Sequence, residues 1–217
     1  MNIWDPFDPV SYLVHVALGF TGVAAALVAL AVRKGSSIHV RLGWVFVASG
    51  TVAAISAVWF ARITGEPFPV ISSLMVFSLL AASLFALRDR TRAVYWGENA
   101  SATVMFLCAL LLLGLAVTAA MAGQLAASVA MLAWAVFPVL FVAGDVRFLR
   151  MPDNERRRRR VGRHLSRMAF AFAIAVHAPV VSFADDLNLD PNLAFFGPFL
   201  IWPIILWRFR SRAANAW

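Results

Sequence analysis

The sequence predicts an all-α, polytopic membrane protein: a bundle of seven transmembrane helices. The first observation is composition, because 62% of the 217 residues are hydrophobic and only 14% are charged, whereas a soluble domain carries about a quarter charged residues. The second is that the apolar residues gather into seven long runs separated by polar breaks. A membrane helix needs roughly 20 apolar residues, and the backbone within lipid must satisfy its own polar groups. These runs therefore predict membrane-spanning helices.

The seven runs also predict how the chain is organised. They lie at residues 10–32, 42–63, 70–87, 101–121, 126–144, 165–183 and 193–207. The third and the seventh are short, and Pro198 and Pro203 predict a kink in the last one, because proline cannot donate the backbone hydrogen bond of a helix interior. So little of the sequence lies outside the runs that we expect a single transmembrane domain over residues 1–217, without a separate soluble catalytic domain.

The basic residues predict the orientation. Every Lys and Arg except Arg62 lies after the first, third or fifth run or in the C-terminal tail. Short basic segments stay in the cytoplasm, so we expect the N-terminus outside and the C-terminus in the cytoplasm of a bacterial inner membrane. The net charge of +8 is thereby explained without nucleic acid, which we do not expect as a partner.

A run of consecutive arginines precedes the sixth apolar segment: Arg156, Arg157, Arg158, Arg159 and Arg160. Arginines near an anionic membrane surface contribute about 1 kcal/mol each to binding it, so the run predicts contact with the headgroups of the lipid bilayer. The alternative is that the run serves only to fix the topology.

Ionisable residues at membrane depth are the candidates for a functional site, because they are costly to keep there. With the predicted orientation, His15 and His177 share an outer layer, and His39 and His164 share an inner one. Two histidines per layer would suit haem b, and imidazole also binds zinc, iron and copper. However, the 13 residues from His164 to His177 correspond to a rotation of about 220°, which argues against two haems on one helix face.

The inner layer has a further candidate ligand in Asp145. If it converges with His39 and His164, the three could bind zinc or iron. Supporting residues would be Arg147, Arg167 and Met168, which lie close to these ligands in sequence. The alternative is a boundary network in which Asp145 pairs with an arginine and the histidines cap helix ends.

A short repeat surrounds two of the histidines. His15 and His39 each begin the pattern His-Val-x-Leu-Gly-aromatic, so Gly19 and Gly43 lie on the same helix face as their histidine. A glycine at that place predicts either close approach of a neighbouring helix or room for a flat cofactor.

Four short motifs carry a family resemblance: His15-x-x-x-Gly19, Lys34-Gly35-x-x-x-His39-x-x-x-Gly43, Asp145-x-Arg147 and Arg163-His164-x-x-Arg167-Met168. In these the chain resembles a family of bacterial predicted membrane proteins that is defined only as a domain of unknown function. The resemblance implies a multi-span bacterial membrane protein and draws attention to His39, Asp145 and His164. It implies no activity.

Three classes of function agree with these features. The sequence favours a binding or structural membrane protein, such as a subunit of a larger membrane assembly, and a catalytic role is not favoured. The second class is a redox protein with haem b or a histidine-bound metal ion. The third is a transporter or sensor for a small or lipidic molecule.

Overall fold

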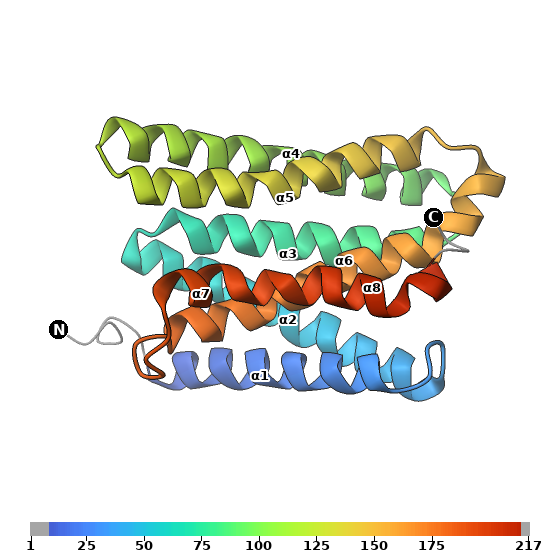
Figure 1. Ribbon diagram of the computed structural model, residues 1–217. Coiled ribbons are helices and arrows are strands. Elements are labelled where there is room, and N and C mark those ends of the chain that lie inside the picture. Colours follow the sequence, from blue (N-terminus) through green and yellow to red (C-terminus); the bar gives the residue numbers. More distant parts are fainter. Residues whose placement is uncertain (1–8, 214–217) are drawn as a thin grey trace. The chain divides into compact units, whose positions relative to one another are not determined.

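The computed structural model describes the backbone of residues 9–213 and the side chains of residues 10–209. Within these residues every secondary-structure element is a helix, which confirms the predicted all-α class (Figure 1). In order, the elements are α1 (Pro9–Ala31), α2 (Ser37–Thr64), α3 (Pro67–Ala86), α4 (Arg92–Met121), α5 (Leu125–Leu149), α6 (Asp153–Ser182), α7 (Pro191–Phe196), the 3₁₀ turn η1 (Gly197–Leu200) and α8 (Ile201–Ala213).

Seven helical segments in the described part of the chain are long and apolar enough to cross a membrane. They are α1 to α6 and the continuous stretch from α7 into α8. Large apolar side chains remain exposed along them, such as Val117 on α4 and Leu140 on α5. Lipid tails could cover such side chains, and the segments are consistent with a multi-pass membrane protein.

Several helices begin earlier than the hydropathy of the sequence predicts, and the difference is largest for α4 and α6. Helix α4 begins at Arg92, where the hydroxyl of Thr91 accepts a hydrogen bond from the backbone N–H of Val94 and caps the helix. Helix α6 begins at Asp153 instead of near residue 165, and carries two acidic residues in its first turn. Such residues stabilise a helix N-terminus. Capping and charge, which a hydropathy profile does not record, thus extend both helices beyond their apolar cores.

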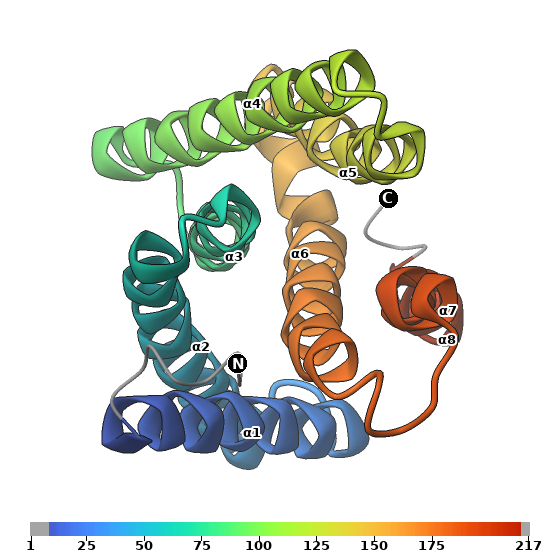
Figure 2. The ribbon, with the colours of Figure 1, turned by 90° about the vertical axis from the view of Figure 1, so that its left-hand side faces the viewer.

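A short 3₁₀ turn interrupts the last segment at Pro198, one of the two prolines for which a kink is predicted. The turn begins at Gly197 and contains Pro198, and α8 follows it directly. Asp190 caps the segment by accepting hydrogen bonds from two backbone N–H groups of α7. In both views α7 and α8 follow nearly the same line (Figure 1 and Figure 2), so the turn interrupts the helix without redirecting the chain.

The chain divides into two compact units. Unit 1 includes residues up to Val76 and Ala169–Arg208, and unit 2 includes Phe77–Met168. In unit 1, α1 and α2 pack together as a hairpin, and in unit 2, α4 and α5 form another (Figure 1). Helices α3 and α6 contribute one half to each unit. The single domain expected over residues 1–217 stays a prediction.

Close helix approach occurs at different glycines from those singled out in the sequence. A Cβ atom on Gly22 would lie 2.7 Å from the hydroxyl oxygen of Ser49 on α2, and one on Gly97 would lie 2.5 Å from the ring of Phe85. Nothing lies within 4 Å of the corresponding position at Gly19 or Gly43. In the α1–α2 hairpin it is therefore Gly22, one turn beyond Gly19, that allows the helices to meet.

Candidate functional site

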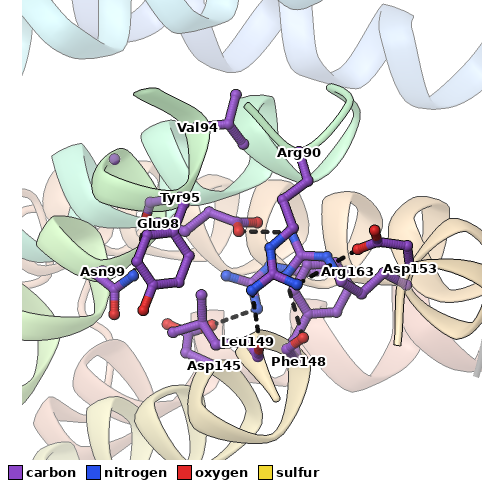
Figure 3. Close-up of polar contacts among 12 residues, drawn as sticks. Arg90, Val94, Tyr95, Glu98, Asn99, Asp145, Phe148, Leu149, Asp153 and Arg163 are labelled. Atoms are coloured by element: carbon purple, nitrogen blue, oxygen red, sulfur yellow. Dashed lines mark hydrogen bonds and ion pairs between the residues drawn. The ribbon is translucent and has the colours of Figure 1, made fainter. Parts of the chain in front are cut away.

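Unit 2 contains a cluster of charged side chains that are almost completely buried (Figure 3). Its members are Glu98 on α4, Asp145 on α5, and Arg156, Arg163 and Arg167 on α6. None is more than 6% exposed, and Glu98 is fully buried. We call these five residues the arginine–carboxylate cluster.

Helix geometry explains how the cluster forms. The three arginines follow one another at intervals of seven and four residues, which places them on one face of α6. Asp145 lies in the last turns of α5, and only the short link from Arg150 to Pro152 separates α5 from α6. Glu98 shares a buried stripe of α4 with Val94, Ala102 and Met105. The same periodicity that buries apolar residues therefore buries Glu98.

One half of the cluster is the ion pair between Glu98 and Arg156. The Nη2 of Arg156 donates a hydrogen bond of 2.7 Å to Oε2 of Glu98, and its Nη1 donates one of 3.2 Å to the backbone oxygen of Phe148. The guanidinium also lies over the Phe148 ring, 4.3 Å from the centroid. A buried charge is tolerated only when it is paired and hydrogen-bonded, and Arg156 meets both conditions.

The other half is Asp145 with two arginines. Its Oδ1 accepts a hydrogen bond from Nη2 of Arg167 and forms an ion pair of 2.9 Å with Nη1 of Arg163. Arg163 also lies over the Phe148 ring, at 4.2 Å, and Arg167 over the ring of Phe141, at 5.5 Å. Of the two arrangements expected for Asp145, the structure contains the pairing with arginine.

Hydrogen bonding in the cluster is incomplete. Within the described residues, Oε1 of Glu98 accepts no hydrogen bond, and Nε and Nη2 of Arg163 donate none. The Nη1 of Arg163 has its ion pair with Asp145, but the geometry of that contact is not that of a hydrogen bond. Buried polar groups are satisfied in the large majority of cases, so these atoms are exceptions that require an explanation.

An exposed pair accompanies the buried ones (Figure 3). Arg90, in the link between α3 and α4, lies 3.4 Å from Asp153 at the start of α6. It also donates a 3.5 Å hydrogen bond to the backbone oxygen of Leu149 and lies over the ring of Tyr95. Exposed pairs contribute little to stability, so we expect the buried cluster to affect the stability of this region more than the exposed pair does.

The five consecutive arginines, for which the sequence predicts lipid contact, have different environments in the structure. Arg156 is buried in the cluster, and Arg159 pairs at 2.8 Å with Glu155 one turn earlier on α6. Arg157, Arg158 and Arg160 are exposed. Contact with anionic headgroups therefore remains a prediction for the exposed three, whereas Arg156 has a different environment.

The segment from Lys34 to His39 covers the end of the connection between α1 and α2 and the first turn of α2. The Nζ of Lys34 donates hydrogen bonds to the backbone oxygens of Ala29 and Leu30, and Nδ1 of His39 bonds to the same Ala29 oxygen at 3.0 Å. Gly35 has a φ of +77°, which glycine adopts without strain. Ser36 caps α2 by accepting from the backbone N–H of His39. This motif thus closes the end of one helix and starts the next.

The remaining histidines lie in separate environments. His15 bonds through Nδ1 to the hydroxyl of Ser56 at 2.7 Å, and its ring packs edge-on against Phe60. His164 bonds through Nδ1 to the backbone oxygen of Ser83 at 3.2 Å. His177 is buried beside aromatic rings of unit 1, namely Phe68, Phe195 and Phe199, with centroids 5.2 to 6.3 Å away.

The three-ligand metal site considered above finds no support among the described residues. Among the described residues, no group of three or more His, Cys, Asp or Glu could hold a metal ion. Asp145, the oxygen ligand expected in the inner layer, is occupied by two arginines. A haem plane at His177 would have to displace part of its aromatic packing. Of the expected supporting residues, Arg167 joins the cluster, whereas Arg147 is exposed and Met168 half-buried.

Glu98 is the functional candidate that the sequence did not reveal. It lies before the apolar run expected at 101–121, so it was assigned to a polar break. A signal was nevertheless present: the small and apolar positions Ala109, Met105 and Ala102 continue at helical spacing back to Glu98. Extending the buried stripe of a helix past the end of its apolar run would have found this carboxylate.

No protein family, no curated protein and no solved structure matches the chain.

Proposed function

We propose that the chain is a multi-pass protein of a bacterial inner membrane, with its N-terminus outside and its C-terminus in the cytoplasm, and that it acts as a binding or structural membrane subunit. Seven helices long and apolar enough to span a membrane support the location. The distribution of Lys and Arg supports the orientation, because all of them except Arg62 fall on the same side of the proposed membrane.

One observation carries the choice of a binding or structural role: the charged side chains of the cluster are buried against one another. A guanidinium stays protonated in proteins, so a carboxylate held by arginines is not poised to exchange protons with a substrate. Glu98 and Asp145 are both held in this way. The cluster is suited to fixing α4, α5 and α6 together and to receiving a polar group, and less suited to acid–base chemistry.

Single-cysteine labelling tests the orientation. Cys108 is the only cysteine and is buried, so a Cys108→Ala chain provides a background without thiols. In it, Glu66→Cys and Gln124→Cys probe the connections after α2 and α4, and Asp89→Cys probes the one after α3. A membrane-impermeant maleimide should label the first two in intact spheroplasts, and the third only after lysis. The reverse pattern would overturn the proposed orientation.

A spectrum tests the proposed role against the redox alternative. Detergent-purified protein should show no Soret band and no stoichiometric metal by elemental analysis. A Soret band lost in His15→Ala plus His177→Ala, or in His39→Ala plus His164→Ala, would show that the histidines hold a haem and would replace the proposed role with a redox one.

A further inference from the structure

The cluster contains one more positive than negative group. Three arginines face two carboxylates, and all five side chains are buried. An uncompensated charge inside a protein is costly, since desolvation of an ion is repaid only by an opposite charge and hydrogen bonds. The imbalance therefore favours a ligand that carries a single negative charge.

Arg163 is the group on which that ligand would bind. Its side chain is 4% exposed. Its Nη1 is directed to Asp145, whereas Nε and Nη2 donate no hydrogen bond to the described residues. Nε and Nη2 form one edge of the planar guanidinium, and their two N–H bonds are parallel. This fork matches two oxygens of a phosphate or carboxylate group.

Glu98 adds a second requirement. Its Oε2 is held by Arg156, but Oε1 is buried without a donor. An ionised carboxylate only accepts hydrogen bonds, so the ligand must present an O–H or N–H group to it as well as an oxyanion to Arg163. A bare anion would meet only repulsion from Glu98.

We propose that the arginine–carboxylate cluster binds the headgroup of an anionic, hydroxyl-bearing phospholipid, of which phosphatidylglycerol is the test case. The phosphate oxygens accept from Nε and Nη2 of Arg163, and a headgroup hydroxyl donates to Oε1 of Glu98. The single negative charge of this headgroup balances the cluster. The exposed arginines Arg157, Arg158 and Arg160 on the same helix raise the local concentration of anionic lipid. This inference rests on the membrane location proposed above and specifies the ligand.

Delipidated full-length protein in detergent tests the proposal. Unfolding is followed by a thiol-reactive fluorescent dye, because Cys108 is buried in α4, the helix that carries Glu98. The probes are phosphatidylglycerol, phosphatidylethanolamine, glycerol 1-phosphate and inorganic phosphate. We expect phosphatidylglycerol to raise the Tm in a concentration-dependent manner. Phosphatidylethanolamine, which has the phosphate and an N–H donor but no net charge, should have a much smaller effect.

Variants assign the effect to the site. Arg163→Gln should weaken the apparent affinity for phosphatidylglycerol about tenfold or more, and Arg163→Lys, which keeps the charge but loses the fork, should weaken it as well. Arg147→Gln removes an exposed arginine on α5, two residues from Asp145, and should leave the affinity within about twofold. If a variant does not fold, wild-type protein is extracted under mild conditions and its retained lipid is identified by native mass spectrometry. We then expect phosphatidylglycerol to be enriched over phosphatidylethanolamine.

Three results would overturn the inference. Equal stabilisation by phosphatidylglycerol and phosphatidylethanolamine would remove the argument from charge balance. Full stabilisation by glycerol 1-phosphate or inorganic phosphate would identify a soluble ligand instead of a lipid. Unchanged affinity in Arg163→Gln would place the lipid elsewhere. The cysteine-labelling experiment tests the membrane location and orientation independently of the lipid. If labelling gives the expected orientation but phosphatidylglycerol has no effect on the Tm, the proposed ligand is wrong and the proposed function stands.

Discussion

Replacing Glu98 by glutamine should destabilise the protein strongly. The substitution keeps the shape of the side chain and removes the charge that faces Arg156 at 2.7 Å. At that separation and an effective dielectric constant of about 20, the attraction between unit charges is about 6 kcal/mol. Removing one partner of a buried pair costs about 3–5 kcal/mol. Arg156 keeps its hydrogen bond to the Phe148 backbone, so we expect the lower end, about 3 kcal/mol.

Thermal unfolding in detergent measures this cost, again with the thiol of Cys108 as the reporter. For a chain of this size, 1 kcal/mol shifts the Tm by about 2–4 °C, so Glu98→Gln should lower it by about 6–12 °C. The double variant Glu98→Gln plus Arg156→Gln should recover part of the loss, because no buried charge is then left without its partner.

A matched control lies on the first turns of α6. Glu155 and Arg159 form an ion pair of nearly the same length, 2.8 Å, but their side chains are 41% and 36% exposed. Exposed pairs contribute at most about 1 kcal/mol, so Glu155→Gln should shift the Tm by no more than about 4 °C. Equal shifts for Glu98→Gln and Glu155→Gln would refute the argument, since they would show that burial does not set the strength of the pair.

Three further predictions concern the α1–α2 hairpin. Gly22→Leu should destabilise it by about 1–3 kcal/mol through overpacking, whereas Gly19→Leu, with open space at its Cβ position, should be tolerated; equal Tm values for the two would contradict the packing. Lys34→Met should cost about 1 kcal/mol by removing a cation from the C-terminal carbonyls of α1, while Arg33→Met, at an exposed neighbour, should not change the Tm. Ser36→Ala should cost about 1 kcal/mol by removing the cap of α2, and a denaturant midpoint equal to that of the unaltered protein would show that the cap contributes nothing.

The fold class could be predicted from the sequence because it depends on the hydropathy of single residues, summed over a stretch long enough to span a membrane. Apolar runs of membrane length locate all seven helical segments. The same summation failed at the starts of α4 and α6, where helices continue through charged residues. There the deciding contacts lie between helices: Arg156 is 58 residues from Glu98 in the chain. No local window contains both partners.

Only part of the candidate site could be predicted from the sequence, because its ion pairs join residues of different helices. Asp145 could be identified because a lone acidic residue at the end of an apolar run requires a partner, but nothing in the sequence selects Arg163 and Arg167 over the exposed Arg147. The spacing along α6 shows which arginines share a face. It does not show which face turns toward α5, because that depends on the packing of the whole of unit 2.

Phe148 carries no charge, but its position links the two halves of the arginine–carboxylate cluster. Its ring lies under both Arg156 and Arg163, and its backbone oxygen accepts a hydrogen bond from Arg156. The two ion pairs of the cluster therefore share a neutral neighbour, and a change in one guanidinium moves the surface on which the other rests. Glu98 and Asp145 should then behave as energetically coupled residues, with non-additive substitutions, although neither contacts the other. Phe148→Leu, which leaves every charge in place, would uncouple them.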